Sequence, residues 1–311
     1  MKNKYGLVIQ GPLRSLGRSG STANIALSNL DSEDVVNFFC IPTVVNYFEK
    51  FNNLEKIVCV VWDDEDKKDV ELLQNIVGHE NIKVIKDRTK PVLTSGGVVP
   101  GNNKYRQFYS TLKGLEFLKK EGVSHIIKVR SDQSLDINKL IEDFETVQKI
   151  RKDTVMVPRV VKNKADHLAD FYFVSEIELF ELLLKDFLEN KEIFHHVHTD
   201  LFYCWAKRFL GQPYLPYFFS KTDLFKEYVL KAWNFGFCPA SKKVYSSIVW
   251  RGENLAYSAT DNIFLEDIDY NLVLRQDQII GKPTLYWLFF SRIKRNIINS
   301  YKKFFYFRRN I

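Results

Sequence analysis

The sequence predicts an α/β protein with a mostly parallel central sheet, and three observations predict it. Apolar runs at residues 5–12, 56–62 and 126–130 are typical of strands that are covered on both faces. Amphipathic segments at 67–77 and 104–120 separate them, and strands that alternate with helices form parallel sheets. Charged residues follow the strands directly, at the edge where such sheets bind ligands. We therefore expect a Rossmann-like fold with a site at that edge.

Composition and charge limit the function classes. The chain has 311 residues, of which 45% are hydrophobic, so it can bury a sizeable core. Its formal charge is +7, and residues 284–311 contain seven basic residues and no acidic one. Without these seven, the chain has 38 basic and 38 acidic residues. Because the body is balanced, we expect no nucleic-acid partner.

Cysteine usage and hydropathy point to a reducing compartment. The four cysteines are far apart in the sequence, no signal peptide is recognised, and no apolar run reaches the length of a membrane span. We expect a cytoplasmic protein. The segment 195–200 contains three histidines and Asp200, but it lacks a spaced partner pair, so a structural zinc site is disfavoured. Asp200 is a good cap for a helix at 201–210.

The first strand ends in Gly11-Pro12, and the loop after it carries Arg14 and Arg18. This loop lacks the spacing of a Walker-type phosphate loop, and no Gly-x-Gly-x-x-Gly motif follows the strand. ATPase-type and dinucleotide oxidoreductase functions are therefore disfavoured. The two arginines either meet a diphosphate or are solvated.

The next segments continue the alternation. Residues 33–51 are expected to be helical, with an interruption or a new start at Pro42. The acidic residues 63–66 follow the second strand and either contact a ribose or base or form a polar entry to the next helix. A third strand is expected at 81–85, and the glycine-rich loop 87–104 is long enough to be functional.

The helix at 104–120, capped by Asn102 or Asn103, carries Arg106 and Gln107 in its first turn. Arginine at this position opposes the helix dipole unless an anion is close. The helix leads into the strand that ends in Arg130-Ser131-Asp132.

This charged strand end is either a ligand site or an internal Arg–Asp pair at a solvated edge. After it we expect helices at 136–150, with Asp136 as cap, and at 176–187, and strands at 154–158 and 171–175.

The C-terminal segment 284–311 predicts an amphipathic helix. An apolar, aromatic face is formed by Tyr286, Phe289, Phe290, Ile293, Ile297, Tyr301 and Phe304. Opposite it lie Arg292, Arg295, Lys302, Lys303 and Arg309, whereas Arg308 breaks the pattern. This pattern is typical of a helix that lies on anionic lipid; the alternative is a core-packing helix with a solvated face. We thus divide the chain into a main domain at 1–245, an extension at 246–283 that packs on it, and this membrane-surface tail.

Three segments together resemble the WavE lipopolysaccharide-synthesis family of bacterial glycosyltransferases. They are VIQGP at 8–12, YRQFYSTLKGL at 105–115 and IKVRSDQ at 127–133, and ADFYF at 169–173 is similar to a fourth. The resemblance covers roughly residues 5–205. It implies a GT-A-like nucleotide-sugar-binding fold in which Arg130-Ser131-Asp132 takes the place of the usual Asp-x-Asp.

Asp-x-Asp holds a divalent ion on the donor diphosphate, and that ion stabilises the leaving nucleotide. In this chain the first aspartate is an arginine. Either Asp132 still binds Mg²⁺ or Mn²⁺ with fewer protein ligands, or Arg130 and Arg106 take over part of the charge stabilisation. Gln10, Gly11 and Gln107 complete the expected donor site.

We therefore expect a glycosyltransferase that moves a sugar from a nucleotide-sugar donor to a lipopolysaccharide, lipooligosaccharide or capsular glycan acceptor at the cytoplasmic membrane face. A carboxylate must take the acceptor proton in an inverting reaction, and Asp200 or Asp170 is expected to do so. The alternatives are transfer of another activated group, such as a nucleotidyl or phospho-alcohol unit, and a non-catalytic membrane-docked assembly protein.

Overall fold

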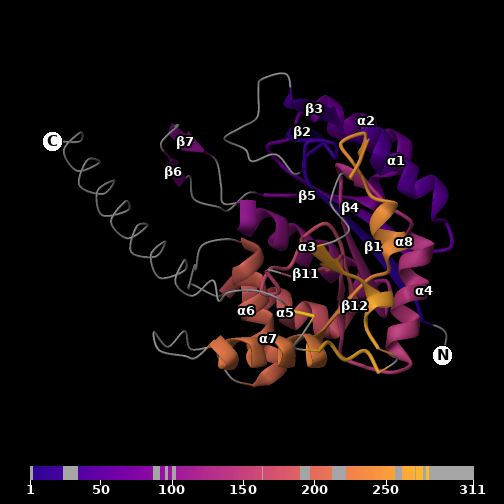
Figure 1. Ribbon diagram of the computed structural model, residues 1–311. Helices are drawn as coiled ribbons and strands as arrows, with labels where there is room; N and C mark the ends of the chain where they lie inside the picture. Colours follow the sequence, from indigo (N-terminus) through magenta and orange to yellow (C-terminus); the bar gives the residue numbers. More distant parts are fainter. Residues whose placement is uncertain are drawn as a thin grey trace.

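A seven-stranded sheet forms the centre of the computed structural model (Figure 1), which describes residues 3–23, 34–86, 92–94, 97–99, 103–162, 164–189, 197–211, 222–255, 261–269, 271–275, 278 and 279. The strand order is β13-β10-β12-β8-β1-β4-β5. These strands are β1 Tyr5–Gln10, β4 Lys56–Trp62, β5 Ile82–Ile85, β8 His125–Arg130, β10 Val155–Val157, β12 Phe173–Glu176 and β13 Phe237–Pro239. The helices are α1 Ile41–Lys50, α2 Lys67–Val77, α3 Asn103–Lys120, α4 Ile137–Gln148, α5 Ile177–Glu189, α6 Val197–Leu210, α7 Thr222–Gly236 and α8 Lys242–Ser246.

The sheet is mostly parallel, which confirms the predicted fold class. β1 pairs in parallel with β4 and β8, and β4 with β5. β12 is the exception, because it runs antiparallel to both β8 and β10. The register places Gln10 opposite Arg130, so the carboxyl ends of β1 and β8 meet at one edge. This is the edge where the sequence predicts a site.

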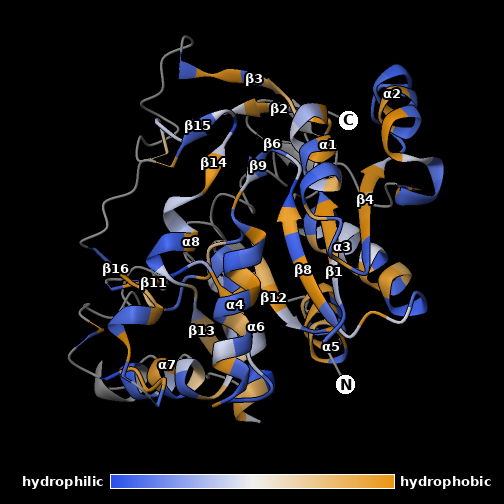
Figure 2. Cartoon of the chain, turned by 90° about the vertical axis from the view of Figure 1, so that its right-hand side faces the viewer, coloured by the Kyte–Doolittle hydropathy of each residue, from blue (hydrophilic) through white to orange (hydrophobic). Residues whose placement is uncertain are grey.

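Both faces of the sheet are covered, and the alternation of side chains along β1 shows why its run is apolar throughout. Leu7 and Ile9 belong to one buried cluster and Val8 to the other, since successive side chains of a strand point to opposite faces. The first cluster packs under α1, α4 and α8, and the second under α3, α5 and α6 (Figure 1). In Figure 2, which colours the chain by hydropathy, β4 and β8 are accordingly largely orange, the hydrophobic end of the scale.

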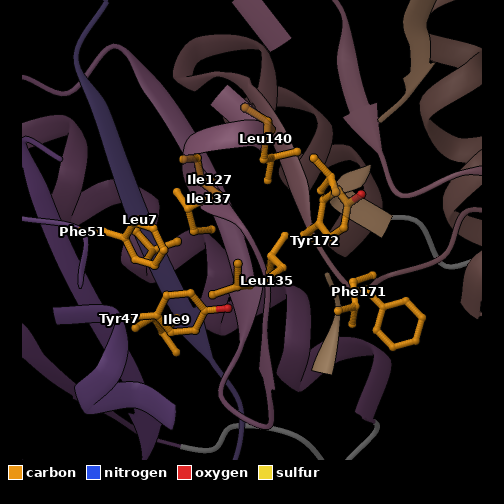
Figure 3. Packing of buried hydrophobic residues seen from close by; sticks show 14 of the residues in the cluster. Leu7, Ile9, Tyr47, Phe51, Ile127, Leu135, Ile137, Leu140, Phe171 and Tyr172 are labelled. Atoms are coloured by element: carbon orange, nitrogen blue, oxygen red, sulfur yellow. The ribbon is translucent and has the colours of Figure 1, made fainter. Parts of the chain in front are cut away.

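Figure 3 shows the first cluster close to the site edge. Tyr47 of α1 lies among Leu7, Ile9 and Leu135, and its hydroxyl donates a hydrogen bond of 3.0 Å to the Gln133 carbonyl. This contact fixes the backbone that follows Asp132. The first cluster therefore holds the backbone next to Asp132 in place through Tyr47.

Short strands surround the site edge. β2 Arg14–Gly17 pairs with β3 Val36–Phe39, and β9 Gln133–Ser134 pairs with the hairpin of β14 Val249–Trp250 and β15 Glu253–Asn254. There are two further strand pairs among the described residues: β6 Val92–Thr94 pairs with β7 Gly97–Val99, and β11 Val160–Val161 pairs with β16 Asn262–Ile263. A 3-10 turn at His79–Asn81 precedes β5, and another at Leu265–Asp267 follows β16. The β14–β15 hairpin therefore joins residues from the C-terminal part of the chain to the centre of the sheet edge.

Three local predictions are wrong. The helix predicted from residue 33 begins only at Ile41, with Pro42 in its first turn, because β3 precedes it. The predicted loop that holds Arg14 is strand β2, since β3 offers it a partner. Helix α6 begins at Val197, so Asp200 lies in its first turn and does not cap it.

Other boundaries agree closely with the sequence. Helix α2 spans the predicted residues, and Asp136 caps α4 by accepting a hydrogen bond from the Lys139 backbone N–H. The four cysteines are buried and form no disulfide with one another. Among the described helices, none has the length and hydropathy needed to span a membrane. The tail at 284–311 lies outside the described residues, and the proposed domain boundaries stay predictions.

Candidate functional site

A cavity of about 270 Å³ opens at the carboxyl ends of β1, β4 and β8. All six side chains predicted to bind the donor line it: Gln10, Gly11, Arg106, Gln107, Arg130 and Asp132. Six further residues complete the lining, namely Pro12, Ser15, Leu16, Trp62, Glu65 and Arg251. The structure thus brings together residues that lie up to 241 positions apart in the chain. Below, "the pocket" means this cavity.

Asp132 occupies the centre of the charged wall, and its side chain is only 1% exposed. Arg130 binds it in a two-pronged ion pair, with Nε 2.9 Å from Oδ1 and Nη2 3.0 Å from Oδ2. Arg251 Nε donates to the same Oδ2 at 3.0 Å. The internal Arg–Asp pair considered for this strand end therefore exists, but it is buried and has a second arginine.

Two neutral donors complete the shell of Asp132. Ser15 Oγ and Trp250 Nε1 donate to Oδ2 at 2.9 and 3.1 Å. Burial alone would raise the pKa of this carboxyl, but the charges of the two arginines and the bond from Trp250 hold the pKa well below its usual range. Asp132 is therefore ionised at neutral pH.

The backbone holds these groups in place. Arg251 has φ +50° in the turn of the β14–β15 hairpin, and its N–H donates to the Asp132 carbonyl at 2.8 Å. At the end of β1, Gly11 has φ +134°, and a Cβ on this residue would lie 2.5 Å from Ser131 Oγ. Glycine at position 11 allows the ends of β1 and β8 to approach this closely.

Arg106 forms a separate part of the wall. Its Nη2 lies 2.6 Å from Asp64 Oδ1, and its guanidinium lies 4.8 Å from the centre of the Trp62 ring. The anion that the helix position predicted is thus supplied by Asp64, one of the acidic residues after β4. The Asp64 side chain is 46% exposed, so water screens this pair and a ligand can compete for the arginine.

Glu65 is the second carboxylate of the pocket, and it differs from Asp132 in its partners. Oε2 accepts a hydrogen bond of 2.9 Å from the Leu13 N–H, whereas Oε1 accepts none from the residues that the structure describes. Burial raises the pKa of Glu65, against the opposing effects of the Leu13 N–H and Arg106. Oε1 can therefore accept a hydrogen bond from a ligand.

Asp170 lies beside the pocket but is not part of its lining. Its Oδ2 is 3.9 Å from Arg130 Nη1, and its carbonyl accepts hydrogen bonds from Gln107 and from the fully buried Lys128. Burial would raise the pKa of Asp170, but the charges of His198, Arg130 and Lys128 hold it well below its usual range. Burial lowers the pKa of Lys128 to about 7.

Asp200 does not meet the other predicted residues in the pocket. It lies in the first turn of α6 with 1% of its surface exposed, and the lining of the pocket does not include it. Its predicted role as a base therefore stays a prediction. The two early arginines also lie outside the lining: Arg14 pairs with Asp69 at 2.6 Å, and Arg18 donates to the Ala23 carbonyl.

The residues around Asp132 do not fit the predicted divalent ion. Both carboxylate oxygens accept hydrogen bonds from the protein, and two of the donors are arginines. Within the described ranges, no group of three His, Cys, Asp or Glu side chains is arranged to hold a metal. Because the Asp132 side chain is only 1% exposed, an ion could reach it only by displacing a neighbouring group, and we assign no reaction step to a metal.

Sequence reasoning missed Arg251, Trp250, Ser15 and a defined role for Glu65. Glu65 had a partial signal, because it belongs to the acidic run after β4. Arg251 is 119 residues from Asp132, and Trp250-Arg251-Gly252 has the sequence of an ordinary turn. Its part in the site depends on the pairing of β14 with β9.

Comparisons with known proteins give distant structural likenesses. No family model matches the chain, and no curated protein matches its sequence. A 4-diphosphocytidyl-2C-methyl-D-erythritol synthase from Anaerococcus prevotii is 9% identical, with TM-score 0.38, over 68% of this chain and 83% of that one. A cytidylyltransferase from Leptospira borgpetersenii is 13% identical, with TM-score 0.32, over 58% and 64%.

A third structure is named mannose-1-phosphate geranyltransferase, from Thermus thermophilus; it is 9% identical, with TM-score 0.33, over 69% of each chain. TM-scores below 0.5 are too low to transfer an activity to this protein. The resemblance to the WavE family accordingly stays a prediction from the sequence motifs.

Proposed function

We propose that the protein transfers a group from a donor that contains a nucleoside diphosphate, and specifically a sugar from a nucleotide-sugar. One observation carries the proposal: Arg106, Arg130 and Arg251 line one pocket at the carboxyl edge of a mostly parallel sheet. Such edges bind ligands in α/β folds. Guanidinium groups suit phosphate oxygens in charge and in geometry.

The lining residues have distinct roles in this proposal. Arg130 and Arg251 bind the diphosphate, and Arg106 exchanges part of its contact with the exposed Asp64 for a phosphate oxygen. Gln10 and Gly11 border the nucleotide at the end of β1, and Gln107 lies beside Arg106 in the first turn of α3. Glu65 Oε1 accepts a hydrogen bond from a ribose hydroxyl or a base N–H.

In the reaction, the acceptor hydroxyl oxygen forms a bond to the anomeric carbon of the sugar. The bond from that carbon to the phosphate oxygen breaks, and the nucleoside diphosphate leaves with the electron pair. The arginines stabilise the charge that develops on the leaving phosphate. In an inverting reaction a carboxylate takes the acceptor proton; Asp170, next to Arg130, and Asp200 stay the proposed candidates.

The acceptor proposal rests on the sequence. The resemblance to the WavE family favours a lipopolysaccharide, lipooligosaccharide or capsular glycan, and the basic, aromatic pattern of 284–311 favours an anionic membrane surface. We therefore propose that the protein acts on the cytoplasmic face of the cell membrane. Binding to vesicles that contain anionic lipid should be lost when 284–311 is deleted, and unchanged binding would contradict this part of the proposal.

A donor screen tests the proposed activity. Nucleotide-sugars, nucleoside triphosphates and nucleotide-activated alcohols are each added in a thermal unfolding assay, because a ligand that binds the folded state raises Tm by mass action. We expect stabilisation by one nucleotide-sugar and release of its nucleoside diphosphate with an acceptor. Stabilisation and turnover by a triphosphate with a sugar phosphate or alcohol phosphate would favour the nucleotidyl or phospho-alcohol alternative. No response to any donor would favour a non-catalytic protein.

A further inference from the structure

We propose that Asp132 is a positioning residue that holds two arginines, and that Arg130 and Arg251 bind the donor diphosphate with no divalent cation at Asp132. This inference rests on the proposed donor and goes further, because it assigns Arg251 to the site and gives Asp132 a role other than metal ligand. Two observations support it: the hydrogen bonds that Asp132 accepts, and the terminal guanidinium nitrogens of Arg130 and Arg251 that make no hydrogen bond among the described residues.

The oxygens of Asp132 are occupied. An ionised carboxylate offers about four lone-pair positions for hydrogen bonds. Oδ1 accepts from Arg130, and Oδ2 accepts from Arg130, Arg251, Ser15 and Trp250. All these contacts lie between 2.9 and 3.1 Å. A metal ligand needs an oxygen lone pair that points at the ion. Oδ2 has none to spare, and Oδ1, which accepts one hydrogen bond among the described residues, belongs to a side chain that is only 1% exposed.

The local charge also opposes a divalent ion. Two guanidiniums lie within 3.0 Å of one carboxylate, so this trio carries one net positive charge, which the Asp170 carboxylate, 3.9 Å from Arg130 Nη1, partly offsets. An added cation would lie close to both arginines. An added anion would be attracted, because the positive charge of the arginines is fixed and partly desolvated before the ligand binds.

Each arginine keeps one terminal nitrogen that makes no hydrogen bond among the described residues, although Arg130 Nη1 lies 3.9 Å from Asp170 Oδ2. Arg130 uses Nε and Nη2 on Asp132, and Arg251 uses Nε on Asp132 and Ser15 and Nη1 on the Arg18 carbonyl. Neither Arg130 Nη1 nor Arg251 Nη2 makes a hydrogen bond within the described part of the chain. Both residues line the pocket, so these two nitrogens can donate to phosphate oxygens.

The two arginines are also held rigidly. Their guanidiniums lie 5.8 and 5.0 Å from the centre of the Trp250 ring, and the side chain of Arg251 is only 9% exposed. Binding a diphosphate therefore costs little additional side-chain entropy. Asp132 supplies this order without contacting the ligand, which is what distinguishes a positioning residue from a metal ligand.

The direct test compares donor binding with and without metal. Calorimetric titration of the full chain with UDP, CDP, GDP and ADP is performed once with EDTA and once with MnCl₂. We expect the nucleotide that binds to do so in EDTA, with an affinity within about threefold of that in Mn²⁺, because the arginines and not an ion supply the charge. Binding only in Mn²⁺ overturns this inference and leaves the proposed function standing. No binding in either condition overturns both.

Arginine variants test which groups take the place of the ion. Arg251→Gln should weaken nucleoside diphosphate binding in EDTA by about 10- to 100-fold, as expected for loss of a charged hydrogen bond. Arg208→Gln is the matched control, because Arg208 pairs with Asp186 on exposed surface outside the pocket, and should bind like the wild type. Equal binding by Arg251→Gln and the control would overturn the role of Arg251.

A spectroscopic measurement tests Asp132 itself. Electron paramagnetic resonance of Mn²⁺ added to the protein without nucleotide should show the same binding for the wild type and for Asp132→Asn. A Mn²⁺ site that is present in the wild type and missing in a folded Asp132→Asn protein would overturn the inference. If that variant does not fold, Arg251→Gln takes its place in the comparison. A tight Mn²⁺ site in the wild type whose affinity increases in Arg251→Gln would overturn the inference, because removing this guanidinium leaves Asp132 available to the ion.

Discussion

The two carboxylates of the pocket, Asp132 and Glu65, have opposite surroundings. Asp132 accepts five hydrogen bonds, and the arginines lower its pKa. Glu65 accepts one, and burial raises its pKa. The carboxylate of Asp132 therefore holds neighbouring protein groups in place, whereas the carboxylate of Glu65 can still accept a hydrogen bond from a ligand. The number and charge of the donors around a carboxylate, and not its place after a strand, indicate what it can bind.

The largest effect is expected from removing the charge of Asp132. Asp132→Asn removes the counter-charge of Arg251 and the nearer of the two carboxylates beside Arg130, and breaking a buried ion pair in this way costs about 3 to 5 kcal/mol of unfolding free energy. Urea unfolding measures the loss. Asp186→Asn is the control, because the Arg208–Asp186 pair has similar geometry but is exposed and should cost about 1 kcal/mol or less. Equal losses in the two variants would contradict the central role of Asp132.

Lys128 sharpens the comparison, because burial and not a partner decides its charge. Its pKa is lowered to about 7 in the folded protein, whereas that of an unfolded lysine is about 10.4. Between these values the unfolded chain binds more protons, so this residue makes unfolding free energy rise with pH from about 7 to about 10.

The measurement compares Lys128→Met with the exposed control Lys120→Met. The wild type should gain about 2 to 4 kcal/mol more than Lys128→Met over that pH range, and Lys120→Met should follow the wild type. Parallel curves for Lys128→Met and the wild type would show that the lysine stays charged in the fold.

Part of this pocket could be predicted from the sequence, and the reason is local. The apolar runs of β1, β4 and β8 mark their own ends, so the sequence predicts a site where these strands end, and Gln10, Arg130 and Glu65 line the pocket there. Parallel strands bring such ends together without further information. All six predicted donor-site residues accordingly line the pocket.

The rest depends on contacts between distant segments. Residues 36–39 belong to a segment that the sequence predicts as helical, but β2 pairs with them, and nothing near Arg251 in the sequence indicates that β14 joins β9. The start of α6 at Val197 shifts Asp200 from a cap into the first turn. Each of these depends on tertiary pairing, which a local pattern does not contain.

Glu65→Gln tests the open member of the carboxylate pair. It should weaken binding of the donor nucleotide by about 1 kcal/mol, or roughly fivefold, through loss of one charged acceptor. Because burial raises the pKa of Glu65 and the arginines lower that of Asp132, Glu65 is protonated before Asp132 as the pH falls into the acid range. The wild type should therefore lose affinity in this range, while Glu65→Gln should not. The exposed variant Glu71→Gln should follow the wild type; identical pH profiles for all three would exclude a contact from Glu65.

The smallest effect is expected at Gly17. It has φ +140°, and a Cβ there would lie 2.5 Å from Arg251 Nη1. Gly17→Ala should therefore displace the end of Arg251 and weaken diphosphate binding by about 1 kcal/mol or less, while the pair between Arg130 and Asp132 persists. Gly122→Ala is the control, because it also has positive φ but no neighbour within 4 Å of an added Cβ. If both variants bind nucleotide equally, the contact between Gly17 and Arg251 does not matter for the site.

The most direct test is a crystal structure of the full chain with the nucleoside diphosphate that binds it, grown with Mn²⁺ present. The account predicts that phosphate oxygens lie within hydrogen-bond distance of Arg130 Nη1 and Arg251 Nη2, and that Asp132 keeps both arginines. A Mn²⁺ ion coordinated by Asp132, with a guanidinium displaced, would contradict it. So would a diphosphate bound outside the pocket.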